Sequence, residues 1–593
     1  MNYVKNMEKN MEKIRHSLSH LMAMAVLEKF PKAKLGIGPT IENGFYYDFA
    51  LPAGALAEAG LPELEKRMRE LIKQNLEFKK EKTSFAEAKK IFSASGGKNQ
   101  SYKLKLIKEL QKSKKPLSIY KSGNFIDLCA GPHIKSTSEI DPDAFKLTKI
   151  AGAYWKGDEK NPMLTRIYGV AFESKNELAG YLKMMEQAEK CDHRNLSERL
   201  GLFMIDEEIG RGLPLWLPRG YKIRHKLEEY IYNLEEENGY PHVLTPILAK
   251  ENLYKKSGHL AHYKEEMYNP IEIDEEKYYL KPMNCPHHHS IFKHTLRSYK
   301  DLPLRIAEFG QVYRYERSGV LTGLIRARGF TQNDAHIYTT EDGLSQEIIN
   351  VFKMHKKVFD VFKIDGYWYR LSLPDFKNKE KFGDIKNKKV WEQGSKILKK
   401  SLEQTGYKFT EAIGEASFYG PKIDIQIKNI WGKEETIATI QVDYYSADKF
   451  NLYYIDKDGK EKPVVIIHRA IFGSFERFFA FLMEKTCGNL PLWLAPVQVK
   501  ILAISDKQAD YAKKILKEFL ENGIEAEMAE TNETLGKRIR ESELQKIPYI
   551  LVAGDKELQN NSASVRHHIK GQLGEIKIEE LIEKIKRETK DKL

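Results

Sequence analysis

Three side chains of a kind that binds zinc stand far apart in the sequence. They are Cys285 in KPMNCPHHH, His336 in TQNDAHIY and His468 in VVIIHRAIFG. A thiolate and two imidazoles suit zinc, and three protein ligands leave a fourth position open for a substrate. Because no short spacing joins them, a buried cysteine and two hydrogen-bonded core histidines would explain the same residues, and ligand type alone leaves both interpretations open.

An arginine-rich segment suits phosphate chemistry. Residues 305–338 have two strand-like halves around a Ser-Gly and Thr-Gly loop, with Arg314, Glu316 and Arg326 in loop or strand positions. A guanidinium bonds two oxygens at once and stays charged, which favours a phosphate clamp over the alternative, a solvated hairpin. Arg477 lies in an otherwise apolar helical stretch, where its burial requires an anion or a carboxylate.

Two further pairs of nucleophilic or ligand-type side chains lie near the N-terminus. His16 and His20 in HSLSH are one turn apart on a helix that we expect over residues 10–30. Cys129 and His133 form a second pair in CAGPH. By themselves, these spacings suggest another zinc hydrolase site.

The pattern of elements divides the chain into three parts. At 593 residues it is too long for one hydrophobic core. The first part is α+β with a helix over 61–79, and a charged linker helix over 177–200 follows. The second part alternates strands with long helices, such as 221–237, which suggests an antiparallel sheet surrounded by helices. The third shows regular βαβ alternation with helices over 508–521, 535–545 and 578–590. We expect domains over 1–194, 195–494 and 495–593.

Composition narrows the class of partner and the compartment. Lys and Arg number 97 against 84 Asp and Glu, a net charge of +13 that favours polyanionic partners, although many basic proteins bind no nucleic acid. No export signal or membrane span is evident. The four cysteines show no paired framework, which suits a reducing cytosol, so we expect a cytoplasmic protein; they are Cys129, Cys191, Cys285 and Cys487.

Together, the motifs KPMNCP, RGFTQNDAHI, FYGPKID and HRAIFGSFERF resemble those of the threonyl-tRNA synthetases, a family of class II aminoacyl-tRNA synthetases. The resemblance covers nearly the whole chain. It implies an α+β multidomain protein with an editing domain, a class II catalytic core on an antiparallel sheet, and a C-terminal α/β anticodon-binding domain. The implied activity is ATP-dependent formation of threonyl-adenylate, transfer to tRNA(Thr), and hydrolysis of mischarged seryl-tRNA(Thr).

The resemblance also assigns residues of the synthetic site. It implies one zinc per subunit on Cys285, His336 and His468, binding the amino group and hydroxyl of threonine and so rejecting valine. ATP with Mg²⁺ would meet Arg314 at the α-phosphate, Glu316 and Phe330 at the adenine, Arg477 at the γ-phosphate, and Arg326 in the clamp. Threonine would lie among Gln332, Asp334, Tyr419 and Gln441, with Lys422 a weaker addition. His259 would assist transfer, or else is a surface histidine.

Serine shares the amino group and hydroxyl of threonine, and one missing methyl is worth only about 1–3 kcal/mol. The resemblance therefore implies a second, metal-free hydrolytic site. Its residues would be His16, His20, Cys129, His133, Asp127 and Lys103. Anticodon reading would fall to Asn532, Glu557 and Arg566, each of which could equally be a solvated surface residue.

The chain departs from the family pattern in three places. Fuller members carry a ubiquitin-like domain ahead of the editing region, and we expect this chain to lack it. His287 replaces a glycine beside Cys285, and Thr436 and Ile437 replace a glutamine and a cysteine. A homodimer formed through residues 221–246 also follows from the resemblance. The rival interpretations are a non-charging paralogue and a free-standing editing hydrolase, and the intact zinc and arginine set argues against both.

Overall fold

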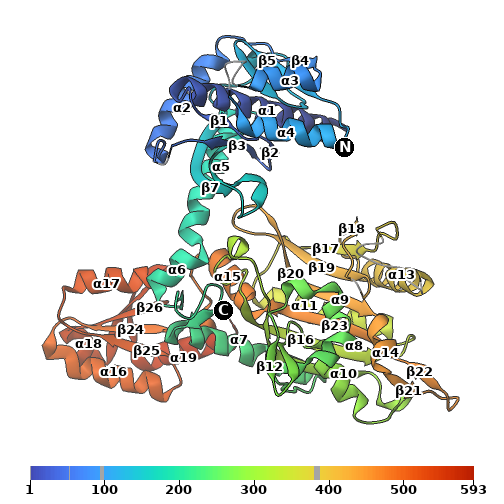
Figure 1. Cartoon of the computed structure of the whole chain (residues 1–593). Helices are drawn as coiled ribbons and strands as arrows, with labels where there is room; N and C mark the ends of the chain where they lie inside the picture. The colour runs from blue at the N-terminus through green and yellow to red at the C-terminus, as the bar shows by residue number, and fades with distance from the viewer. Residues whose placement is uncertain (1, 53, 94–98, 379–387, 418, 593) are drawn as a thin grey trace. The chain divides into compact units, whose positions relative to one another are not determined.

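The computed structural model describes residues 2–52, 54–93, 99–378, 388–417 and 419–592 (Figure 1). Phe418, the first residue of FYGPKID, lies outside the described residues. The chain forms two compact units, one up to Glu186 and one from Gln187 onward. Each unit has its own hydrophobic core.

The first unit packs a long helix on an antiparallel sheet. Helix α1 (Asn2–Lys29) contacts strand β3 (Gly44–Ala50), and Leu18 and Leu21 of the helix are fully buried. The sheet order is β1-β3-β8-β7, with β1 Lys34–Leu35, β7 Phe145–Tyr154 and β8 Met163–Ala171, and β2 (Thr40–Ile41) pairs with β3. A smaller sheet joins β4 (Lys79–Lys82), β5 (Ser118–Ser122) and β6 (Phe125–Leu128).

One helix of the first unit ends earlier than the sequence pattern predicts. Helix α2 runs over Leu61–Ile72 and then stops, seven residues before the expected end at 79. Residue Asn75, at φ 53°, is in the left-handed region, which ends any helical continuation. Helices α3 (Phe85–Phe92) and α4 (Ser101–Lys112) cover the small sheet.

The prediction of a single linker helix over 177–200 is wrong, because the helix is interrupted at Asp192. Helix α5 (Lys175–Cys191) ends there and α6 (His193–Leu200) begins. Asp192 has non-helical backbone angles, φ −56° and ψ 129°, and its carboxylate accepts a hydrogen bond from the Arg194 backbone N–H at 2.8 Å. This is the geometry of an N-cap, a position that aspartate favours.

A seven-stranded sheet forms the centre of the second unit. Its order is β15-β16-β23-β20-β19-β17-β18, and every neighbouring pair is antiparallel except β17 with β18, so the expected antiparallel core is confirmed. The strands are β15 Leu304–Tyr313, β16 Gly329–Thr339, β17 Trp368–Leu373, β18 Phe409–Ile413, β19 Lys422–Lys428, β20 Glu434–Asp443 and β23 Val465–Ser474.

Helices pack on this sheet and close its core. They include α7 (Pro218–Glu237), α11 (Leu344–Val361), α13 (Lys388–Thr405) and α15 (Phe475–Thr486). Helix α7 starts three residues before the expected 221, because a proline suits the first turn, where its missing N–H has no intrahelical partner. Shorter helices flank the strands: α8 Glu251–Lys256, α9 His259–His262, α10 Cys285–Lys293 and α14 Tyr445–Phe450.

The C-terminal part of the second unit is the expected α/β arrangement. Its sheet order is β25-β24-β26-β27-β28, parallel in the first three strands and antiparallel afterwards. The strands are β24 Val499–Ala503, β25 Ala526–Ala529, β26 Tyr549–Ala553, β27 Ser562–His567 and β28 Gly571–Lys577. Helices α16 (Ala509–Glu521), α17 (Leu535–Leu544) and α19 (Ile578–Lys590) match their expected ranges within one residue, and α18 covers Asp555–Asn560.

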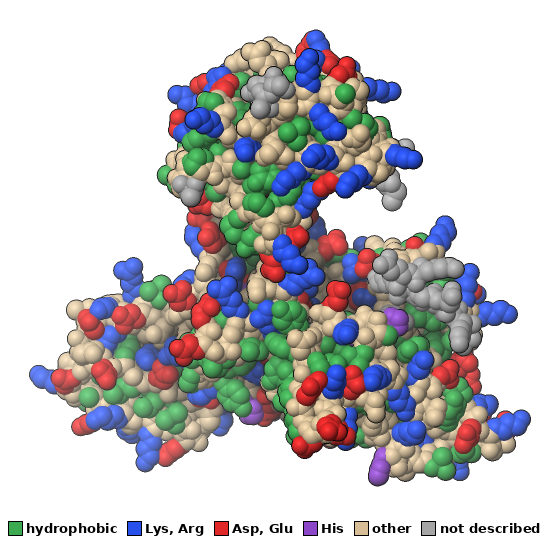
Figure 2. All heavy atoms as spheres, in the orientation of Figure 1, with side chains coloured by type: hydrophobic (Ala, Val, Ile, Leu, Met, Phe, Trp, Pro, Cys, Tyr) green, Lys and Arg blue, Asp and Glu red, His purple; other side chains and the backbone are tan. Residues whose placement is uncertain are grey.

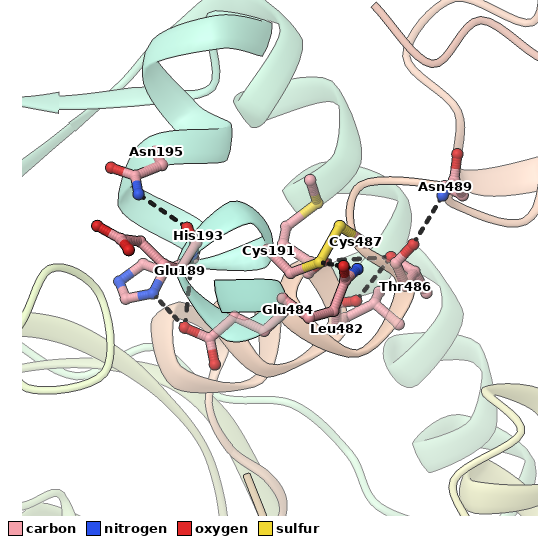
Figure 3. The surroundings of a disulfide bond; sticks show 11 residues. Glu189, Cys191, His193, Asn195, Leu482, Glu484, Thr486, Cys487 and Asn489 are labelled. Carbon is pink, nitrogen blue, oxygen red and sulfur yellow. Dashed lines mark hydrogen bonds and ion pairs between the residues drawn. A yellow bond between two sulfur atoms is a disulfide. The ribbon is translucent and has the colours of Figure 1, made fainter. Parts of the chain in front are cut away.

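Two of the cysteines form a disulfide that the sequence did not suggest. Cys191 at the end of α5 is bonded to Cys487, which follows α15, across 296 residues of sequence (Figure 3). The expectation that no cysteines pair is therefore wrong for these two, since a pattern of spacings cannot reveal contacts made by packing. Cys129 and Cys285 are free thiols.

The surface carries both signs of charge. Figure 2 shows Lys and Arg side chains interspersed with Asp and Glu on the visible face of each unit, with no separate basic stripe there. Among the described residues, no helix is both long and apolar enough to cross a membrane.

A buried ion pair joins α7 to the central sheet. The Arg469 guanidinium of β23 donates to the Glu235 carboxylate of α7, and neither side chain is exposed. Glu235 also accepts from Asn333 of β16 at 2.8 Å and lies 2.9 Å from His242. Burial raises the pKa of a carboxyl, but the Arg469 charge and these hydrogen bonds outweigh it, and the pKa of Glu235 is lowered.

We predict that Glu235→Ala strongly destabilises the second unit. The substitution leaves the Arg469 charge buried without a partner, which costs about 3–5 kcal/mol. Thermal and denaturant unfolding of the purified protein would measure the loss. The matched control is Glu237→Ala on the same helix, because Glu237 forms an exposed pair with Lys357 and should leave the transition almost unchanged. Equal shifts for both variants would contradict the assigned role.

Candidate active sites

The central sheet brings the proposed substrate-binding side chains onto one face. On β16, Gln332, Asp334 and His336 alternate, so they point to the same side. His336 is paired with His468 of β23, and His468 is paired with Gln441 of β20. The register thus places side chains from three strands side by side, although they are up to 136 residues apart in sequence.

The ligand-type atoms of Cys285, His336 and His468 all lie within 4.8 Å of one another. One nitrogen of each ring is engaged elsewhere: His336 Nδ1 lies 2.8 Å from His288 Nδ1, and His468 Nε2 lies 2.9 Å from Asp443 Oδ2. Among the described residues, His336 Nε2 has no hydrogen-bond partner although it is buried. A buried nitrogen of this kind, beside a thiol and a second imidazole, fits a zinc ion.

The partners of these two histidines were not recognised from the sequence. Asp443 is fully buried, which by itself raises the pKa of a carboxyl, but the hydrogen bond and the charge of His468 outweigh burial, and the pKa is lowered. His288 lies 3.0 Å from the Glu308 carboxylate, which in turn lies 3.2 Å from the buried Lys281 ammonium. Hydrogen bonds of this type orient metal ligands. No local pattern marks these residues, because the contacts join separate strands and a helix.

A cavity of about 700 Å³ opens over this face. Arg314, Arg326 and Arg477 all line it, and Arg314 stacks over the Phe330 ring at 5.1 Å. Burial, together with the nearby charges of Arg314 and Arg326, lowers the pKa of Arg477. Three guanidiniums that repel one another in one cavity favour a polyanionic ligand.

The remaining residues predicted to bind ATP and threonine also line this cavity. The Tyr419 hydroxyl donates to Gln441 Oε1, and Asn284 donates to Asp334 Oδ2 at 3.0 Å. Glu316 pairs with Arg326 at 2.9 Å. The lining includes Glu316, Gln332, Asp334, Tyr419, Lys422, Gln441, and the unusual pair Thr436 and Ile437.

His259 is brought near the cavity without appearing in its wall. It is 2% exposed, so the interpretation as a surface histidine is wrong. Its Nδ1 lies 2.8 Å from the Ser257 hydroxyl. Burial and the Arg314 charge lower the pKa of His259 to about 4. His287, which replaces the glycine beside Cys285, is buried as well.

The first unit brings its predicted residues into a second cluster. Cys129 Sγ lies 3.4 Å from His16 Nε2 and 3.4 Å from His133 Nε2. Helix α1 supplies His16, while the loop after β6 supplies the other two. Burial and the Asp127 charge raise the pKa of Cys129 to about 11, so the thiol is neutral at pH 7. Burial lowers the pKa of His133 and His20, which are therefore neutral imidazoles.

An ion pair lies beneath this cluster. The Lys103 ammonium is 2.5 Å from Asp127 and 3.0 Å from the Tyr47 hydroxyl, which itself donates to Asp127 at 2.6 Å. His20 Nε2 lies 3.5 Å from the same carboxylate. All six predicted residues thus meet at one place. The ligand atoms of His16, His20, Cys129 and His133 also lie close enough to hold a metal ion, so the expected absence of metal stays a prediction.

The three predicted anticodon residues have separate partners. Asn532 is exposed and donates to Glu530, and Arg566 pairs with Glu543 at 2.6 Å. Glu557 accepts from the Gly554 backbone N–H at the start of α18, as a helix cap does. Their role in recognition stays a prediction.

The fold and the site define a class II aminoacyl-tRNA synthetase. Residues 263–486 match the tRNA synthetase class II core domain (G, H, P, S and T), residues 498–588 match the anticodon binding domain, and residues 117–168 match the threonyl and alanyl tRNA synthetase second additional domain. All three parts of the expected architecture are confirmed. The exact boundaries at 194 and 494 stay predictions.

Comparison with individual proteins gives the family. The chain is 44% identical over 580 residues to the threonine–tRNA ligase of Oceanobacillus iheyensis, covering 98% of this chain and 88% of that protein. It is 45% identical over 580 residues to the Thermotoga neapolitana ligase, with the same coverage of both chains. The chain therefore belongs to the threonine–tRNA ligase family, the threonyl-tRNA synthetases.

Solved structures agree with this assignment. A threonyl-tRNA synthetase structure from Cryptosporidium parvum Iowa II, described as its RNA binding domain, aligns with a TM-score of 0.61 at 35% identity, covering 67% of this chain and 98% of that one. The putative threonyl-tRNA synthetase ThrRS-1 of Aeropyrum pernix aligns with a TM-score of 0.59 at 29% identity, covering 68% of this chain and 97% of that one.

Proposed function

We propose that this threonine–tRNA ligase activates threonine with ATP in the 700 Å³ cavity and transfers it to tRNA(Thr). The observation that carries the proposal is the convergence of Cys285, His336 and His468 with three arginines on one cavity. The first group suits a metal and an amino acid, and the second suits a triphosphate. A paralogue that does not charge tRNA would not need a metal-binding group and a triphosphate-binding group in the same cavity.

The amino-acid end of the cavity is the part around Cys285, His336 and His468, which would hold zinc. Bound there, zinc would supply an open position for the amino group and hydroxyl of threonine. Asp443 and His288 would keep the two imidazoles turned toward the ion. Gln332, Asp334, Tyr419 and Gln441 would orient threonine beside it.

The nucleotide end is the part around the β15–β16 loop, residues 314–328. Arg314 would bind the α-phosphate while Phe330 stacks on the adenine and Glu316 accepts a hydrogen bond from it. Arg477 and Arg326 would hold the outer phosphates, with Mg²⁺ neutralising the rest. Fixed guanidiniums around the α-phosphate stabilise the charge that develops when the threonine carboxylate attacks it.

His259 would act in the second step, the transfer to the terminal ribose of tRNA. Its lowered pKa keeps the imidazole neutral, so it can accept a proton from the ribose hydroxyl. The anticodon-binding domain would read the tRNA through Asn532, Glu557 and Arg566. A cytoplasmic location fits this activity and stays a prediction.

The cluster of the first unit would remove serine from mischarged tRNA(Thr). Neutral His16, His20 and His133 offer proton acceptors beside the Cys129 thiol. The buried Lys103 and Asp127 pair keeps its geometry fixed. These groups can position and activate a water molecule without a metal ion.

A homodimer fits the distribution of exposed apolar side chains. Leu244 is 89% exposed, although leucine favours the interior. Other large apolar residues with exposed surfaces cluster between 204 and 273 in the sequence, overlapping the segment 221–246 that the resemblance assigns to dimerisation. They are Met204, Ile205, Ile209, Leu215, Tyr221, Tyr232, Ile247, Leu248, Ile271 and Ile273.

We expect ATP–pyrophosphate exchange with threonine and weakly with serine, but not with valine, which lacks the hydroxyl. Chelation or Cys285→Ser should remove both zinc, measured by metal analysis, and exchange. Cys129→Ser is the matched control, because it alters a thiol in the other unit. Absence of exchange with every amino acid on zinc-loaded protein would favour the non-charging paralogue.

We expect Lys103→Met to lower the hydrolysis of seryl-tRNA(Thr) by about tenfold or more, because the buried Asp127 loses its counter-ion. Exchange with threonine should stay unchanged. Lys105→Met, an exposed position on the same helix, is the control. His16→Ala tests the same cluster through a side chain that is only partly buried, unlike Lys103. Normal deacylation by both the Lys103 and the His16 variant would rule out this site.

We expect Leu244→Glu to convert a dimer into a monomer, because it places a charge at the centre of an apolar contact. Light scattering after size-exclusion chromatography would measure the mass. Leu296→Glu, also highly exposed at 77%, lies outside the segment and should leave the mass unchanged. A wild-type chain that is monomeric at micromolar concentration would contradict the proposed dimer.

A further inference from the structure

His193 links the segment after α5 to two parts of the nucleotide end. Its side chain is fully buried, and its Nδ1 lies 2.7 Å from Glu484 Oε1 of α15 (Figure 3). On the other side, Leu324 of the β15–β16 loop donates its backbone N–H to His193 Nε2 at 3.1 Å. The imidazole ring of His193 therefore connects α15, whose first turn contains Arg477, to the loop that carries Arg314 and Arg326.

The two hydrogen bonds define the proton on this ring. Because the Leu324 N–H is a donor, Nε2 must be the acceptor. The ring proton is then on Nδ1, where it is donated to the Glu484 carboxylate. The ligand atoms of Asp192, Glu484 and His193 are close enough to hold a metal ion. Both ring nitrogens of His193 already have hydrogen-bond partners, so we interpret this cluster as a structural hydrogen-bond network.

The loop is shaped to fit this ring. Gly323 has a positive φ of 47°, and a Cβ there would lie 2.2 Å from His193 Nε2. The next residue, Leu324, is 1% exposed. Ile325 then accepts a hydrogen bond from Arg477 Nε at 3.2 Å, and Leu324 and Ile325 both line the cavity. A shift of His193 would therefore move backbone that contacts the nucleotide end.

Covalent and polar contacts hold His193 itself in place. Cys191, two residues before it, is bonded to Cys487, and Cys487 is three residues after Glu484 (Figure 3). The disulfide and the His193 to Glu484 hydrogen bond thus join the same two segments. Asp192 caps α6 between them and binds the Arg194 side chain at 2.7 Å.

We propose that His193 is a positioning residue for ATP, because it holds the β15–β16 loop through the Leu324 N–H. The Cys191–Cys487 disulfide keeps His193 close to Glu484 of α15. The inference rests on the proposed function, since the loop is assigned to ATP there. Neither His193 nor the disulfide contacts the reacting atoms. Reduction of the disulfide, by a dithiol that is itself oxidised to its disulfide, yields two thiols and releases this tie.

The test compares two substitutions that each keep one of the ring's contacts. The amide of His193→Asn lies where Nδ1 was and can still donate to Glu484, but it cannot reach Leu324. The amide of His193→Gln extends to the position of Nε2 and can accept from the Leu324 N–H. ATP–pyrophosphate exchange with threonine would give the KM for ATP, the KM for threonine and kcat for each variant.

His193→Asn should raise the KM for ATP about three- to tenfold, the effect of one lost hydrogen bond, while kcat at saturating ATP and the KM for threonine change little. His193→Gln should restore the KM for ATP to near the wild-type value. Thermal unfolding controls for stability. If both variants have equal KM values for ATP, or if the KM for threonine rises in parallel, His193 has no positioning role.

The same assay tests the disulfide. The double variant Cys191→Ser and Cys487→Ser should raise the KM for ATP in the same direction, and a dithiol should do so in the wild type but not in the double variant. An unchanged KM in the double variant would remove the disulfide from the proposal. A wild-type protein without exchange would instead contradict the proposed function, so the two failures are distinguishable.

Discussion

Side chains on neighbouring antiparallel strands meet in pairs, and this geometry positions the residues that the central sheet contributes to the candidate site. Within one strand every second side chain faces the cavity, and across the sheet the register places His336, His468 and Gln441 in one row. If either strand slipped by one residue in its pairing, its side chains would move to the opposite face of the sheet. The register is held by the apolar face of the same strands, where Ile337, Ile467 and Val442 are buried.

The cost of this arrangement is a large number of polar groups away from water. The buried charges have partners: Arg469 pairs with Glu235, His468 with Asp443, and Lys281 with Glu308. These pairs tie helices and neighbouring strands to the central sheet, so the groups that could bind a metal ion or phosphates have little freedom to turn. His336 Nε2 is one of several buried nitrogens without a hydrogen-bond partner among the described residues, and it is the one that lies beside Cys285 and His468.

The two candidate sites use opposite electrostatic designs. The cavity of the second unit is lined by Arg314, Arg326 and Arg477, whose positive charges favour an anionic ligand. The cluster of the first unit is nearly neutral: burial holds its histidines and its thiol uncharged, and Lys103 is balanced by Asp127. The first design suits activation with a triphosphate. The second suits hydrolysis of an ester, where neutral proton acceptors are needed beside a water molecule.

The sequence by itself determined the family, the three parts of the chain and several of the longer helices, because motifs and apolar periodicity are local signals. Helix α19 is an example, since Ile578, Leu581, Ile582 and Ile585 fall on one face and are buried. Only the tertiary structure decided which residues support the sites. Asp443 beside His468, His193 between Glu484 and Leu324, and the bond between Cys191 and Cys487 all depend on segments far apart in the chain. Such contacts follow from packing and strand register, which no local spacing records.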